Sequence, residues 1–67
     1  MQSTLKIINL ENNKDVRKIG EILTNLDGII AYEINKSKKE LKVFFDTRSL
    51  NEENMINNIE NGGYSIL

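Results

Sequence analysis

Hydrophobic and polar residues change their spacing several times along this 67-residue chain, and each change predicts a new structural element. An alternation over residues 4–8 predicts a strand that places Leu5 and Ile7 on the same face. Between Val16 and Leu26 the apolar residues follow the helical period instead. This second segment therefore predicts an amphipathic helix with one apolar stripe.

Polar residues mark both ends of this predicted helix. Asn12 or Asn13 is suited to cap its first turn, where the carboxylate of Asp15 would complement the positive helix end. Gly28 is suited to end the helix, because glycine readily adopts the left-handed backbone of a helix exit.

The middle of the chain predicts an antiparallel hairpin. Two alternating segments, 29–35 and 40–46, flank the polar turn 36–39. Such a pair of short alternating runs around a polar turn is typical of two adjacent strands. The three lysines of the turn are expected to form its solvated tip.

The last third of the chain predicts a helix and a short strand. Asn51 is suited to cap the helix, Gly62 and Gly63 to end it, and residues 64–67 to form the strand. The complete order predicts an α+β class fold in a single domain of residues 1–67. This fold is the ferredoxin-like βαββαβ sandwich, with two helices on one face of a four-stranded antiparallel sheet.

The composition excludes several classes of function. Nine Lys and Arg against ten Asp and Glu give a net charge of −1, so we expect neither nucleic-acid binding nor a membrane-surface role. The absence of Cys and His removes thiolate ligands and the commonest general base. No apolar run could span a bilayer, so we expect a cytoplasmic protein without membrane insertion. We also find no nucleophile–base pair or phosphate loop, and therefore expect no enzyme activity.

Four segments match a known pattern in the same order. Residues 5–7 resemble its first strand, 15–19 its first helix start, 26–29 its helix exit, and 55–64 its closing helix and turn. Together they resemble the heavy-metal-associated domain of copper chaperones and of metal-pumping P-type ATPases. The resemblance runs without a gap over residues 4–66, and it implies the strand order four, one, three, two.

The loop that gives this family its metal chemistry differs here. Residues 9–15 stand where the family has its Gly-Met-x-Cys-x-x-Cys motif. Leu10 keeps the apolar anchor, but Asn12 and Asp15 replace the two cysteines. Thiolates select copper(I), whereas amide and carboxylate oxygens are hard donors. The resemblance therefore implies a degenerate site and no soft-metal cofactor.

The oxygen-rich loop leaves a second interpretation open. Glu11, Asn12, Asn13 and Asp15 offer oxygen ligands for a weakly bound divalent cation. Calcium, however, takes about six to eight oxygen ligands, and no calcium-loop spacing is present. The simpler interpretation is that Asn12 and Asp15 only cap the first helix.

The sheet face opposite the helices is the predicted interaction surface. Ile8, Phe44 and Leu67 have the outward parity on three neighbouring strands, so we predict an apolar surface for a protein partner or a second copy. Leu10 and Tyr64, beside the loop, are further candidate contact residues.

Three functions follow from these observations. The first is a non-catalytic docking or regulatory module in metal homeostasis, whose thiolate site is degenerate. The second is weak divalent-cation binding by the oxygen ligands of the loop. The third is a structural domain that forms homodimers through its sheet and is unrelated to metals.

Overall fold

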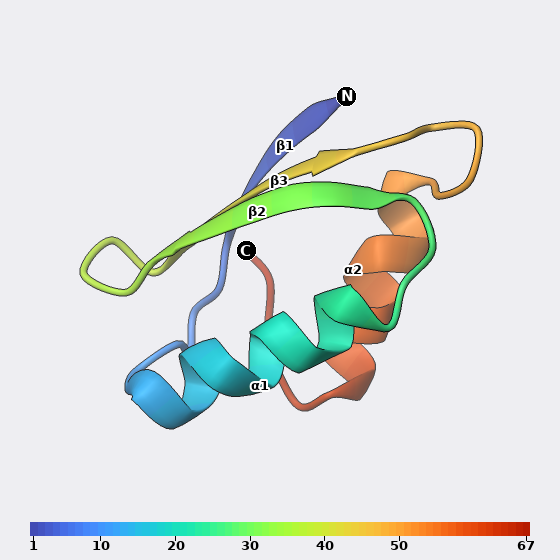
Figure 1. Ribbon diagram of the computed structural model, residues 1–67. Coiled ribbons are helices and arrows are strands. Elements are labelled where there is room, and N and C mark those ends of the chain that lie inside the picture. Colours follow the sequence, from blue (N-terminus) through green and yellow to red (C-terminus); the bar gives the residue numbers. More distant parts are fainter.

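The computed structural model describes all residues 1–67 and contains two layers, a sheet and a pair of helices that cover one of its faces (Figure 1). The elements in chain order are β1 (Gln2–Lys6), α1 (Asn13–Thr24), β2 (Ile29–Asn35), β3 (Glu40–Phe45) and α2 (Glu52–Asn61). The strands are antiparallel in the order β1-β3-β2. This arrangement confirms the predicted ferredoxin-like fold. Neither helix has the length and apolar character needed to span a membrane.

The predicted fourth strand is present only as a single bridge, which corrects the four-stranded sheet to three strands. Ile66 pairs with Ile7, and the flanking amides of Ile8 and Leu67 donate to the carbonyls of Ser65 and Lys6, both at 2.9 Å. The chain leaves the sheet in a turn directly after this point. Only a short stretch beyond β1 therefore lies beside residues 65–67, which is too little for a ladder.

Both helices begin at the predicted caps. The Asn12 side-chain oxygen accepts a hydrogen bond from the Asp15 amide at 3.0 Å, and Asn51 accepts one from Asn54 at 2.7 Å. Helix α1 ends at Thr24, before the predicted exit, because its last turn tightens. Gly28 instead has a φ of +98° in the turn that leads into β2, a backbone conformation that favours glycine.

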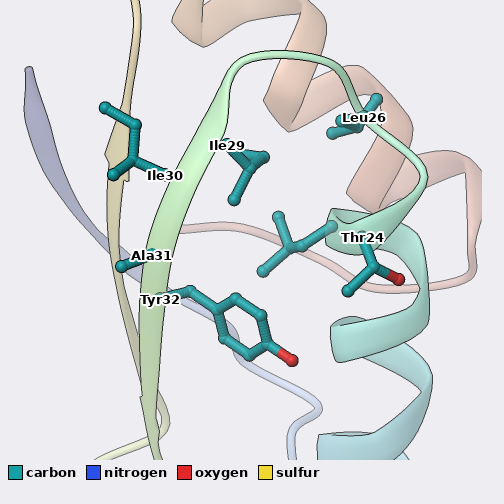
Figure 2. A pocket seen from close by; sticks show the side chains of 7 residues that line it. Thr24, Leu26, Ile29, Ile30, Ala31 and Tyr32 are labelled. Carbon is teal, nitrogen blue, oxygen red and sulfur yellow. The ribbon is translucent and has the colours of Figure 1, made fainter.

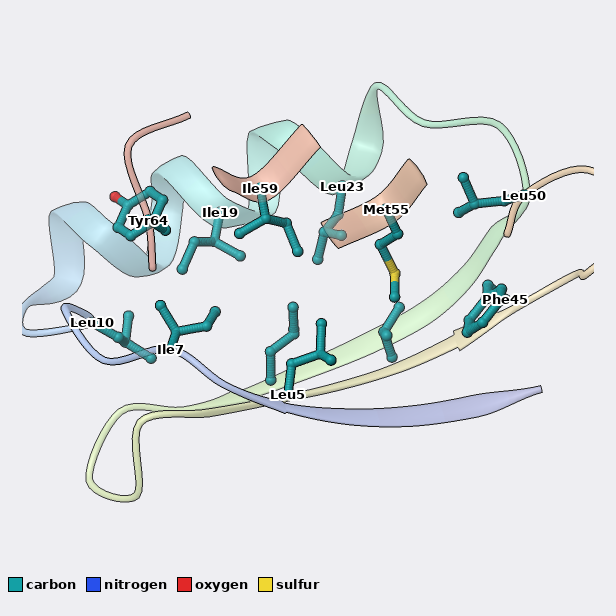
Figure 3. Packing of buried hydrophobic residues seen from close by; sticks show 12 residues of the cluster. Leu5, Ile7, Leu10, Ile19, Leu23, Phe45, Leu50, Met55, Ile59 and Tyr64 are labelled. Carbon is teal, nitrogen blue, oxygen red and sulfur yellow. The ribbon is translucent and has the colours of Figure 1, made fainter. Parts of the chain in front are cut away.

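The core lies between the sheet and the two helices (Figure 3). It contains twelve buried apolar or aromatic residues that come from β1, β3, both helices and the connecting segments, with none from β2: Leu5, Ile7, Leu10, Ile19, Leu23, Leu41, Val43, Phe45, Leu50, Met55, Ile59 and Tyr64. Leu5 and Ile7 are both buried, as their shared face predicts, and β3 contributes Leu41, Val43 and Phe45. On β2, the inward-facing Tyr32 stays 39% exposed because this strand lies at the edge of the sheet.

A bulge at the start of β2 breaks the simple alternation that the sequence predicts. Ile29 pairs with Phe45, but Ala31 pairs with the adjacent Phe44, so Ile30 is the extra residue. Figure 2 shows that Ile30 and Ala31 point to the same side, away from α1, whereas Ile29 points toward the helices. Ile30 is consequently 70% exposed.

Candidate functional site

The loop between β1 and α1 is closed by hydrogen bonds to one carboxylate. Oδ2 of Asp15 accepts from the backbone amides of Glu11 at 3.0 Å and Asn12 at 3.3 Å. Oδ1 accepts from the hydroxyl of Tyr64 at 2.9 Å. Because the Asn12 side chain caps the Asp15 amide in return, the residues at the two cysteine positions form a reciprocal capping box.

These contacts fix the protonation states of both side chains. The amide of Glu11, followed by the hydroxyl of Tyr64, holds the pKa of Asp15 below its usual value. Burial, together with the hydrogen bond and charge of Asp15, raises the pKa of Tyr64 to about 12. At neutral pH the carboxylate of Asp15 is therefore ionised, and Tyr64 keeps the proton that it donates.

A second connection joins this loop to the turn that follows α2. The side-chain amide of Asn9 donates to the Gly63 carbonyl at 2.9 Å, and its oxygen accepts from the Ser65 amide, also at 2.9 Å. This role of Asn9 is not visible in the sequence, because nothing in its spacing distinguishes it from the other loop asparagines. Asp15 therefore fixes the loop to the start of α1, and Asn9 fixes it to the turn that follows α2.

The four predicted oxygen donors do not converge on one point. Glu11 and Asn13 are exposed, and the Asn13 side-chain oxygen accepts from Nζ of Lys36 at 2.8 Å. Both oxygens of Asp15 already accept hydrogen bonds. No group of three or more His, Cys, Asp or Glu side chains is arranged to hold a metal ion. The donor set is hard and dispersed, so it does not fit copper(I).

Two of the five predicted contact residues lie in the core, which corrects their placement on the surface. Leu10 is fully buried, and Tyr64 is only 5% exposed (Figure 3). The ammonium of Lys18 lies 5.8 Å from the centroid of the Tyr64 ring and covers it on the outside. The side chains of Leu10 and Tyr64 pack in the core under the loop, so little of their surface is accessible to a partner.

The other three predicted contact residues are exposed, but they do not form one surface. Phe44 pairs with Gln2, six positions from Ile8, which corresponds to about 20 Å along the strand direction. Leu67 lies beside Lys6, between these two positions. The single apolar surface predicted from parity is therefore wrong in its extent, since parity defines a face but not a distance along it.

The middle of the open sheet face is charged. Glu33 pairs with Lys42, and Lys6 pairs with Glu40, all with side chains on the face opposite the helices. Cross-strand pairs of opposite charge stabilise a solvated sheet face. This arrangement is typical of a face exposed to water rather than of an apolar interface.

Cationic side chains surround the closed loop. Lys14, Arg17 and Lys18 line a hollow on the exposed side of α1, together with Glu21. From the β2–β3 turn, Lys39 donates through Nζ to the Ile8 carbonyl at 3.1 Å. The loop end of the molecule is therefore basic although the net charge is −1.

Four of the ten acidic residues lie at the opposite end. They include Asp27 in the turn before β2 and Glu52 and Glu53 in the first turn of α2. Asp46 at this end pairs with Arg48 at 3.0 Å. The protein is thus polarised along its strands.

Comparisons with known proteins identify this architecture. A scan against protein-family models and a search of curated proteins give no match. Among solved structures, the CopZ metallochaperone is similar over all of both chains, with 21% identity and a TM-score of 0.94. The putative copper-ion-binding protein from Bacillus anthracis str. Ames has 19% identity, 100% and 94% coverage and a TM-score of 0.94. The chain has the heavy-metal-associated fold.

A further structure extends the similarity to a transporter domain. The copper binding domain from HMA7, a P-type ATPase, has 19% identity, covers 98% of this chain and 92% of its own, and has a TM-score of 0.89. At these identities the likeness concerns the heavy-metal-associated fold itself. This chain keeps that fold without any cysteine, and the capping box of Asn12 and Asp15 organises the loop.

The bond between Tyr64 and Asp15 predicts a loss of stability in alkaline solution. An unfolded tyrosine ionises near pH 10, whereas folded Tyr64 ionises at about 12. Between these values unfolding releases a proton, so the free energy of unfolding should fall as the pH rises. Urea unfolding at a series of pH values measures this slope. Tyr64→Phe should reduce this slope relative to the natural protein, and an unchanged slope in that variant would contradict the assignment.

Proposed function

We propose that this protein is a small, non-catalytic interaction module of metal homeostasis that docks on a protein partner and carries no soft metal ion. The observation that supports this most directly is the carboxylate of Asp15, which accepts three hydrogen bonds at the position of a family cysteine. The heavy-metal-associated fold is therefore kept, while the group that would bind copper(I) is replaced by a helix cap.

A cation would have to compete with this network. Binding to Asp15 would displace the hydroxyl of Tyr64 or the two backbone amides, and the buried Tyr64 hydroxyl is costly to leave without a partner. The basic side chains around the loop would repel the cation as well. Both effects oppose metal binding at this loop, and neither requires a change in the fold.

The same basic side chains favour a docking role. Lys14, Arg17 and Lys18 project from α1 beside the loop, and their hollow faces solvent. Clustered charge of one sign steers an oppositely charged partner and sets its orientation. We infer that the partner presents an acidic surface to this end of the molecule.

Titration followed by amide proton–nitrogen NMR tests the proposal. The labelled protein is titrated with anaerobic copper(I), zinc and calcium, and then with unlabelled, cysteine-bearing heavy-metal-associated domains of the same organism. We expect no saturable shifts with the metal ions. A partner domain should shift the amides of residues 10–18 and 36–39, because these surround the basic end.

Charge reversal supplies the matched control for docking. Lys14→Glu with Lys18→Glu should weaken binding of the partner domain, whereas Lys42→Glu on the open sheet face should leave it unchanged. Saturable shifts of residues 10–16 and Tyr64 with any of the three metal ions would overturn the metal-free assignment. Equal weakening by Lys42→Glu would overturn the assigned docking surface.

A further inference from the structure

Strand β2 is the uncovered edge of the sheet. The opposite edge, on β1, is partly bridged by residues 65–67, whereas β2 pairs only with β3. Exposed edges are commonly blunted by lysine, by proline or by a bulge. Strand β2 contains no lysine or proline and carries one charge, Glu33, and its bulge at Ile30 lies at the start of the strand. Its outer backbone groups are thus available to another strand.

The surface beside this edge is grooved, and the groove is apolar along the first half of β2. Two hollows flank Tyr32 between β2 and α1, and they share Tyr32 and Thr24; Figure 2 shows the first of them. Leu26 and Ile29 line one hollow, and Gly20 lines the other. A Cβ atom on Gly20 would lie 2.7 Å from the Tyr32 hydroxyl, so the missing side chain lets Tyr32 lie against α1.

The charge distribution selects the orientation of an added strand. β2 begins after Asp27 at the acidic end and leads into Lys36 and Lys38 at the basic end. A second copy added antiparallel would place its basic turn beside Asp27, and its own Asp27 beside the first basic turn. A parallel copy would instead place like charges together, which disfavours that arrangement.

The register follows from the same residues. With Tyr32 opposite Tyr32 of the second copy, Asp27 lies level with the 36–38 segment, and Glu33 lies opposite Ala31. Over residues 31–33, beyond the bulge, this register places side chains of the same face opposite one another, and a shift by one residue would break that match. A shift by two residues toward the turn would place Glu33 opposite Glu33, which is destabilising.

We propose that two copies of this protein associate through antiparallel pairing of their β2 strands, around a two-fold axis near Tyr32, to form a continuous six-stranded sheet. Tyr32 of one copy lies next to Tyr32 of the other copy, and the contact between the two β2 strands covers Ile30. The two Asp27 residues pair with the two basic turns. This contact is distinct from the open-face contact predicted from sequence parity, and it does not depend on the proposed docking function.

The size of the contact sets the expected affinity. A single seven-residue edge strand with its flanking groove falls in the class of small, transient interfaces, which bury less than about 1,200 Å² in total. The dimer should therefore form in the upper micromolar to millimolar range of protein concentration and exchange rapidly. Its sedimentation coefficient should rise with concentration, and the amide signals of β2 should shift in parallel.

Matched substitutions test the edge. Ile30→Lys places a lysine on the edge strand and should leave a monomer at every concentration. Ile8→Lys is the control, because Ile8 is also exposed but lies in the turn after β1, outside β2, and this variant should associate as the natural protein does. Sedimentation velocity of the three proteins over the same concentration series gives the comparison.

A charge swap tests the orientation without disturbing the core. Asp27→Lys and Lys38→Glu, each alone, should raise the dissociation constant about tenfold through two exposed ion pairs. The double variant should regain the natural value, because the pairs are restored with inverted signs. A natural protein that stays monomeric, as it would if a foreign strand were the true occupant, overturns the proposal. So does association that survives Ile30→Lys, or a double variant weaker than both single variants.

Discussion

Replacing Asn12 and Asp15 together by cysteine should create a tight copper(I) site on this chain. The two residues face each other across the first turn of α1, since the Asn12 side chain reaches the Asp15 amide at 3.0 Å. Two thiolates at these positions would be the soft ligands that copper(I) prefers. The free amides and the positive end of the helix would also lower their pKa values and favour the ionised form.

The gain is measured by competition with a coloured copper(I) chelator under anaerobic conditions. We expect the double variant to bind several orders of magnitude more tightly than the natural protein. Each single cysteine variant is a matched control and should gain much less, because one thiolate cannot hold the ion alone. A natural protein that competes as well as the double variant would contradict the proposed metal-free function.

Leu10→Ala should cost the protein about 2–5 kcal/mol in free energy of unfolding. Leu10 is fully buried beneath the loop, in the same core as Ile7 and Ile19. Removing its side chain loses apolar burial and leaves a cavity that the surrounding core fills only in part. Because a domain of this size has only a few kcal/mol of stability, a substantial fraction of the variant should be unfolded.

Urea unfolding followed by circular dichroism measures this effect. Ile8→Ala is the control, since Ile8 is half exposed and its truncation should change the free energy of unfolding by less than about 0.5 kcal/mol. A loss below 1 kcal/mol for Leu10→Ala, in the approximate range for a surface position, would mean that Leu10 is not a core residue.

The sequence predicted the parts of the fold that depend on local spacing. The helical stripe from Val16, the hairpin around the 36–39 turn and the caps at Asn12 and Asn51 are all confirmed. Each of these depends on residues only a few positions apart, so their pattern is visible in the chain. The fold class followed because the order of such elements admits few arrangements.

The candidate site was less predictable, because its contacts join distant residues. Tyr64 and Asp15 are 49 positions apart, and nothing in their local sequence indicates that the hydroxyl meets the carboxylate. The burial of Leu10 depends on how the loop folds back over the core. Side-chain parity likewise assigned Ile8 and Phe44 to one face but gave neither their separation nor the bulge at Ile30.

The side chain of Asn9 has a consequence for the energetics of binding. It holds the loop before α1 and the turn after α2 through two hydrogen bonds, across more than fifty positions of the chain. Segments fixed in this way lose little conformational entropy when a partner binds, and preorganisation of this kind favours affinity. The basic end therefore presents a rigid shape, and it should discriminate between partners by their fit to that shape as well as by their charge.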